Sequence, residues 1–131
     1  MNAYATSSHA NYRESAILTA PPEQLMIMLY DGCHRFLLQA IAGMREGSIA
    51  AAGERLGRAT AIIDELQCTL DPSAGEVAER LAGIYVFCRR HLAEGLLERD
   101  VDKLSEVDAL LRQLRDAWAQ AATAMAAAPA A

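Results

Sequence analysis

Four long stretches of this chain repeat apolar residues every three or four positions, and residues that break helices separate the stretches. That period places the apolar side chains of each stretch on one face of an α-helix. The stretches cover residues 22–42, 48–70, 74–98 and 101–125. Helices of this size are about 30 Å long, and short connections force neighbouring helices to run antiparallel. The pattern therefore predicts an all-α fold, an antiparallel four-helix bundle.

The breaks between the stretches indicate where each helix begins and ends. Gly43 and Gly47 should end the first helix, because glycine is favoured just beyond a helix C-terminus. The second helix should end before the segment 71–73, which contains a proline. Ser73 can then cap the third helix, and Glu76 stands three residues later, as a capping box requires.

The length of the chain, 131 residues, suits a single domain with its own hydrophobic core. We expect the bundle to occupy residues 17–125. Residues 1–16 are polar and lack a helical period, so we expect a flexible N-terminal arm there. Residues 126–131 are low in complexity and should form a disordered tail.

The charge and hydropathy of the chain exclude several classes of partner. The formal net charge is −5 and the basic residues are scattered, so the chain lacks the basic patch of a nucleic-acid-binding protein. No signal peptide or apolar run of membrane-spanning length is visible, so we expect a cytoplasmic protein without membrane insertion. Cys33, Cys68 and Cys88 lie in apolar helical contexts, and we expect reduced, buried thiols.

Residues capable of catalysis or metal binding do not form a recognisable motif. His91, Glu94 and Gly95 match the spacing His-x-x-Lys-Gly of histidine phosphotransfer bundles, but a glutamate in place of the lysine would repel a phosphoryl group. Cys33 and His34 point about 100° apart on a helix and cannot bind one zinc ion together. We therefore expect no cofactor, no metal and no enzymatic activity. A phosphotransfer bundle acting through His91 is the alternative from another class.

The first predicted helix carries more apolar surface than one core face needs. A second set of residues widens its apolar arc to roughly 220°, compared with roughly 100° or more for an ordinary surface helix. The set comprises Ile27, Tyr30, Leu38 and Ile41, with His34 among them. Either this helix lies at the centre of its own bundle, or part of the set forms a groove for a partner's helix or extended chain.

The N-terminal arm contains a few apolar residues that could cover such a groove while it is empty. They are Tyr12, Ile17 and Leu18. We interpret these three residues as a displaceable lid.

Four sequence elements, in this order and with these gaps, resemble the FliS family of flagellin-specific export chaperones. They are SAILTAPPEQLMIMLYDG, LGRATAIIDELQCTLD, GEVAERLAGIYVFCRRHL and SEVDALLRQLRDAW. The resemblance covers about residues 13–120. It implies an antiparallel four-helix bundle that binds the disordered C-terminal segment of flagellin in the cytosol. It also implies that the protein keeps flagellin monomeric and delivers it to the export gate of the flagellar type III apparatus.

A chaperone for a long amphipathic segment needs continuous apolar surface with few fixed polar requirements. On the resemblance, we expect partner-binding residues on the first three helices. They are Ile27, Tyr30, Asp31, Leu38, Ala59, Ile63 and Tyr85. Ile63 and Tyr85 could equally be ordinary core, and Asp31 could pair within the bundle instead. A bundle adaptor for a different helical client is a third hypothesis, and an empty apolar groove could also drive a weak homodimer.

Overall fold

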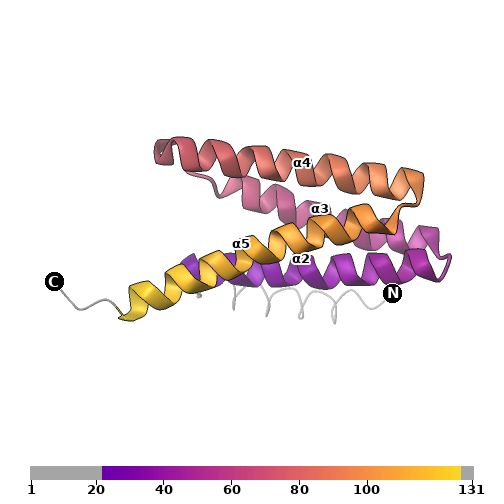
Figure 1. Ribbon diagram of the computed structural model, residues 1–131, viewed down its shortest axis with the longest axis horizontal. Helices are drawn as coiled ribbons and strands as arrows, with labels where there is room; N and C mark the ends of the chain where they lie inside the picture. The colour runs from indigo at the N-terminus through magenta and orange to yellow at the C-terminus, as the bar shows by residue number, and fades with distance from the viewer. Residues whose placement is uncertain (1–21, 128–131) are drawn as a thin grey trace, which may run out of the picture.

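The computed structural model describes the backbone of residues 22–127 and the side chains of residues 22–124. Its elements are the α-helices α2 (Pro22–Arg45), α3 (Ile49–Cys68), α4 (Glu76–Glu98) and α5 (Val101–Ala127), with the short 3-10 helix η1 (Pro72–Ala74) before α4. The predicted all-α class is confirmed (Figure 1). The predicted arm, the lid residues Tyr12, Ile17 and Leu18, and most of the predicted tail lie outside the described residues.

Each helix packs against the two helices that neighbour it around the bundle. α2 contacts α3 and α5, and α4 contacts the same two helices, so α2 and α4 face one another diagonally. Figure 1 shows α2 and α4 on opposite sides, with α5 beginning beside α4 and diverging from it toward α2. This divergence leaves the first turns of α4 less covered than the rest of the bundle.

The core combines aliphatic side chains with two buried tyrosines. Its fully enclosed large side chains are Tyr30, Tyr85, Leu37, Ile63, Leu66, Leu92, Leu104, Val107, Cys33 and Cys88. The Tyr30 and Tyr85 hydroxyl oxygens lie 2.6 Å apart in a hydrogen bond that joins α2 to α4 across the bundle. Burial raises the pKa of both tyrosines. Trp118 is half-buried and packs against this core from α5.

Gly43 does not end the first helix, contrary to the prediction. α2 continues to Arg45, and Gly47 follows it with a positive φ of 78°. Gly43 instead lets α3 approach closely, because a Cβ there would lie 3.2 Å from the backbone nitrogen of Ala52. The sequence shows a glycine near a helix end, but this one serves packing between helices.

The predicted capping box of α4 is wrong. Ser73 belongs to η1, and its backbone N–H donates to the Asp71 carboxylate at 2.9 Å. Hydrogen bonds from the side chain and the backbone of Ser73 lower the pKa of Asp71. Gly75, with φ of 66°, is the N-cap residue of α4, which begins at Glu76. No side chain forms a capping hydrogen bond at this helix N-terminus. The proline at position 72 favours the tight turn, and this turn moves the start of α4 beyond the reach of Ser73.

The cysteines divide into two buried thiols and one exposed thiol. Cys33 and Cys88 are enclosed, and burial raises the pKa of Cys33 to about 12 and that of Cys88 to about 11. The Cys33 thiol also points at the carbonyl of Ala59 on α3, 3.6 Å away. Cys68 is exposed at the last residue of α3, which corrects the prediction that all three are buried.

Candidate functional site

The exposed side of α2 retains part of the second apolar set. Leu38 is 48% exposed and Met28 is 36% exposed, while Ile27 is half-buried. Asp31 is half-buried at the edge of the same face and accepts a hydrogen bond from Arg115 Nε of α5 at 3.0 Å. That bond raises the pKa of Arg115. Of the predicted partner-binding residues, Ile27, Asp31 and Leu38 are therefore accessible in whole or in part.

The other four predicted partner-binding residues are buried, as the alternative of ordinary core allows for Ile63 and Tyr85. Tyr30, Ala59, Ile63 and Tyr85 are at most 1% exposed and form part of the core. Direct contact between their side chains and a partner does not fit this arrangement, because α2, α3 and α4 enclose them together. Much of the wide apolar arc of α2 is therefore explained by contact with α3, α5 and the Tyr85 side chain.

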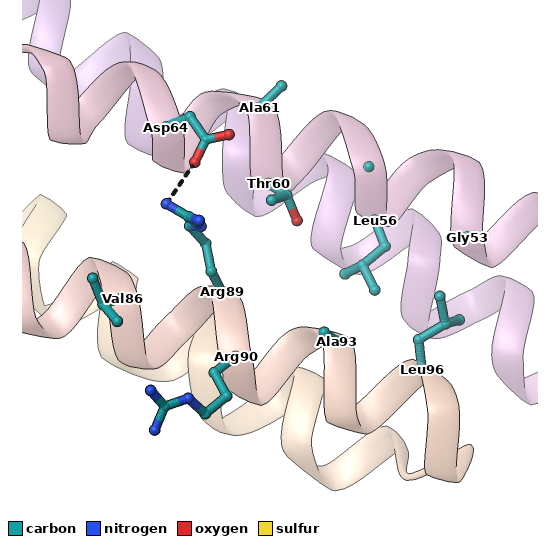
Figure 2. A pocket seen from close by; sticks show the side chains of 11 residues that line it. Gly53, Leu56, Thr60, Ala61, Asp64, Val86, Arg89, Arg90, Ala93 and Leu96 are labelled. Carbon is teal, nitrogen blue, oxygen red and sulfur yellow. Dashed lines mark ion pairs between the residues drawn. The ribbon is translucent and has the colours of Figure 1, made fainter.

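A groove between α3 and α4 has a volume of about 700 Å³ (Figure 2). Its α3 side is made of small residues, and its α4 side carries apolar and basic side chains. The lining residues are Gly53, Leu56, Gly57, Thr60, Ala61, Asp64, Val86, Arg89, Arg90, Ala93 and Leu96. Sequence reasoning missed the α3 side. The available signal was Gly53 and Gly57, two glycines four residues apart inside a helix.

Two arginines of α4, Arg89 and Arg90, line this groove, and only Arg89 forms an ion pair with the described residues. Arg89 Nη1 lies 3.2 Å from Asp64 Oδ1 and donates to Gln67 at 3.3 Å, which bridges α4 to α3. Arg90 is exposed and forms no ion pair with the described residues. Figure 2 shows its guanidinium pointing away from the Arg89–Asp64 pair.

A second apolar hollow lies where α5 diverges from α4. Its volume is about 410 Å³, and its lining residues are Val77, Arg80, Leu81, Leu114, Ala117, Trp118 and Ala121. Val77 is 64% exposed. The reason is tertiary, since the C-terminal half of α5 no longer covers this end of α4.

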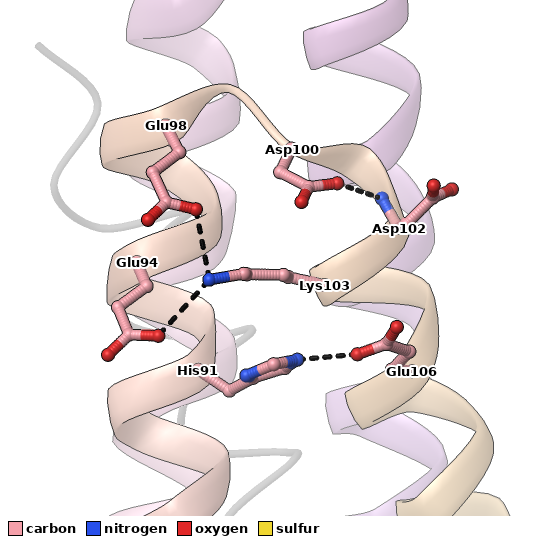
Figure 3. A network of polar contacts seen from close by, with 7 residues as sticks. All are labelled: His91, Glu94, Glu98, Asp100, Asp102, Lys103 and Glu106. Atoms are coloured by element: carbon pink, nitrogen blue, oxygen red, sulfur yellow. Dashed lines mark hydrogen bonds and ion pairs between the residues drawn. The ribbon is translucent and has the colours of Figure 1, made fainter.

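His91 is embedded in a network of charged side chains between α4 and α5 (Figure 3). Its Nε2 lies 2.6 Å from the Glu106 carboxylate, and its ring stacks on Phe87 with 4.9 Å between centroids. Lys103 Nζ lies 2.9 Å from Glu98 and 3.2 Å from Glu94. The Glu98 and Glu94 hydrogen bonds raise the pKa of Lys103. Carboxylates therefore surround both the imidazole and the lysine, which disfavours a phosphoryl group at His91.

A separate polar cluster joins α2 to α5. His34 Nδ1 lies 2.6 Å from Oδ1 of Asp108, which is 8% exposed. A hollow of about 300 Å³ next to this pair is lined by Tyr30, Asp31, His34, Arg112, Arg115 and Asp116. Arg115 pairs there with Asp31 and with Asp116, and His34 pairs with Asp108, which indicates a structural connection between α2 and α5. Across residues 22–124, no group of three or more histidine, cysteine or carboxylate side chains is arranged to hold a metal ion.

None of the helices in the described residues has the length and hydropathy needed to cross a membrane.

Comparison with known proteins identifies sequences similar to this one over most of its length. The family model described as "Flagellar protein FliS" matches residues 4–125. The flagellar secretion chaperone FliS of Salmonella typhimurium strain LT2 is 38% identical over 109 residues, which cover 82% of this chain and 81% of that relative. The protein of the same name from Bacillus subtilis strain 168 is 32% identical over 110 residues, covering 84% and 82% respectively.

A solved structure shows the same fold at lower sequence identity. It is described as a crystal structure of a flagellar chaperone from bacteria, and its TM-score against this chain is 0.73 at 19% identity. The superposition covers 91% of this chain and 98% of that structure.

Proposed function

This chain belongs to the FliS family of flagellar secretion chaperones, and from that premise we propose that it binds the disordered C-terminal segment of flagellin in the cytoplasm. Binding would hold flagellin as a monomer and prevent premature polymerisation. The complex would then deliver flagellin to the export gate of the flagellar type III apparatus. The client segment gains helical structure as it binds, so its recognition is coupled to folding.

The observation that carries this proposal is apolar surface left uncovered on two sides of the bundle. Leu38 and Met28 are exposed on α2, and Val86, Phe87 and Leu97 are exposed on α4, with Leu97 84% exposed. Large apolar side chains that remain exposed on a small domain are candidates for a binding surface. Their distribution over two helices suits a long amphipathic segment better than it suits a small molecule.

The two alternatives predict different partners. A phosphotransfer bundle needs a phosphoryl group on His91, and the carboxylates of Glu94 and Glu106 oppose that charge. A general adaptor would bind unrelated amphipathic helices as tightly as it binds flagellin.

Calorimetric titration with the C-terminal segment of the cognate flagellin tests the proposal. We expect tight binding, a large negative heat-capacity change and a gain of helicity in circular dichroism. An unrelated amphipathic segment of the same length and net charge is the control for adaptor behaviour. No heat of binding at micromolar concentration would refute the proposal, and equal binding of the unrelated segment would favour the general adaptor.

A variant lacking residues 1–18 tests the predicted lid. If Tyr12, Ile17 and Leu18 compete with the client, the truncated protein should bind the flagellin segment more tightly. Unchanged or weaker affinity would contradict the lid.

A further inference from the structure

Helix α4 carries most of the large apolar side chains that remain exposed on the described residues. Four of the six lie on this helix. They are Val77, Val86, Phe87 and Leu97. Among the long helices, α4 contacts only α3 and α5, so its outward side has no helix against it (Figure 1). Burial of these side chains against a partner would be favourable, because it removes apolar surface from water.

The outward residues of α4 repeat with the spacing of a helix-pairing face. From residue 83 they follow one another at intervals of three, four, three and four positions, and all are exposed. They are Gly83, Val86, Arg90, Ala93 and Leu97. Residues repeat in this way along the seam between two paired helices. The core-facing stripe of α4 is a separate set that contains Tyr85, Cys88 and Leu92, so the bundle itself does not account for the outward repeat.

This outward face is complementary to itself when two copies of α4 run antiparallel about a two-fold axis at position 92. Arg90 then lies opposite Glu94 of the second copy, because the two positions are equally far from the axis. Val86 and Phe87 lie beside Leu97 of the second copy, and the symmetry repeats each contact. Residues 86–97 span about 16 Å of helix, from the rise of 1.5 Å per residue.

The charges on α4 favour this register. Arg90 forms no ion pair with the described residues. Glu94 uses Oε2 in its ion pair with Lys103 at 3.2 Å, and Figure 3 shows its other carboxylate oxygen pointing away from Lys103. A carboxylate accepts several hydrogen bonds, so this oxygen is available to the guanidinium of Arg90 in a second copy. A two-fold axis at position 90 would instead place the two Arg90 side chains against each other, which like charges disfavour.

We propose that, while no client is bound, two copies of this chain associate through the outward face of α4, with residues 83–97 paired antiparallel about a two-fold axis. This inference goes beyond the proposed function, because it names what covers Val86, Phe87 and Leu97 in the absence of a client. Each copy contributes a single helix, so the interface is small and the association should be weak and reversible.

Analytical ultracentrifugation of the full chain without client, from about 10 μM to about 500 μM, tests the proposal. We expect the average mass to rise from that of a monomer toward that of a dimer. Leu97→Glu should weaken the association by about tenfold or more, because it places a carboxylate against apolar side chains of the other copy. Leu38→Glu alters an exposed leucine on α2 and is the matched control, with an expected change of less than about twofold.

Both leucines are exposed, so both variants should keep the circular dichroism spectrum of the unaltered chain. A monomeric mass over the whole concentration range would overturn the proposal. Equal weakening by Leu97→Glu and Leu38→Glu, or no weakening by Leu97→Glu, would also overturn it.

A pair of charge variants tests the register. Arg90→Glu and Glu94→Arg each place like charges at facing positions, so each protein alone should associate at least about fivefold more weakly than the unaltered chain. Mixing the two variants places opposite charges at both facing pairs, and the association should recover to within about twofold of the unaltered chain. No recovery on mixing would overturn the assigned pairing.

The ion pair between Arg58 and Glu54 on α3 provides the control for net charge. Arg58→Glu and Glu54→Arg change the net charge by the same amounts, away from α4, and each should leave the association within about twofold of the unaltered chain. Equal weakening by these variants would show a general charge effect and overturn the proposal. Flagellin binding is measured separately by calorimetry, so failure of this proposal is distinguishable from failure of the proposed function.

Discussion

The hydrogen bond between Tyr30 and Tyr85 supports a quantitative prediction. It joins the diagonal helices α2 and α4, with 2.6 Å between the two hydroxyl oxygens. Tyr30 is 1% exposed and Tyr85 is 0% exposed. Tyr30→Phe or Tyr85→Phe keeps the ring and removes one hydroxyl, which leaves the other buried without this partner. Each single variant should lose about 1–3 kcal/mol of unfolding free energy, since an unsatisfied buried polar group costs that much.

The double variant should behave differently from the sum of the singles. With both hydroxyls absent, no polar group is stranded and two rings of nearly the same shape remain in contact. We expect the double variant to be no less stable than the weaker single variant, with a coupling energy of at least about 1 kcal/mol.

Urea unfolding followed by far-ultraviolet circular dichroism measures these free energies, and the four proteins of the cycle should share one slope against denaturant. In thermal unfolding, each kcal/mol should shift Tm by roughly 3–6 °C for a domain of this size. Free energies that add to within about 0.5 kcal/mol would refute the reasoning, because they would show that neither hydroxyl depends on the other.

Three further predictions concern packing, thiols and a polar contact. Gly43→Ala should destabilise the protein by about 1–3 kcal/mol by pushing on the α3 backbone, whereas Gly57→Ala should stabilise it by up to about 1 kcal/mol, both measured by urea unfolding. In the native protein a thiol reagent should label Cys68 alone, and in denaturant it should label all three cysteines. Burial raises the pKa of the other two thiols from 9.0 to about 12 and about 11, so between those values the unfolded chain releases protons that the folded chain keeps, and stability should fall as pH rises above about 9. An unfolding free energy that stays constant from about pH 8 to about pH 10.5 would contradict this prediction. His34→Ala should cost about 1–3 kcal/mol in urea unfolding because it strands the buried Asp108 carboxylate, and restoration of stability by Asp108→Ala in the same chain would identify that carboxylate as the cause.

The sequence alone was sufficient for the fold class and the order of the helices. The 3.6-residue period of α2, α3, α4 and α5 is a local property, and each helix must bury its apolar stripe against another. Short connections then leave an antiparallel bundle as the simple solution. Local signals were less reliable at the helix ends, where Gly43 and Ser73 were both assigned to the wrong role.

Only the tertiary structure decided which apolar residues are core and which remain accessible. Tyr30 and Leu38 belong to the same wide apolar arc of α2, yet one is 1% exposed and the other 48%. Their exposure depends on where α3, α4 and α5 lie, which is a non-local property that a helical period does not encode. The same reason applies to Gly57, because a glycine in a helix shows from the sequence that a side chain is missing, and only the position of α4 shows that the space beside it is an open groove.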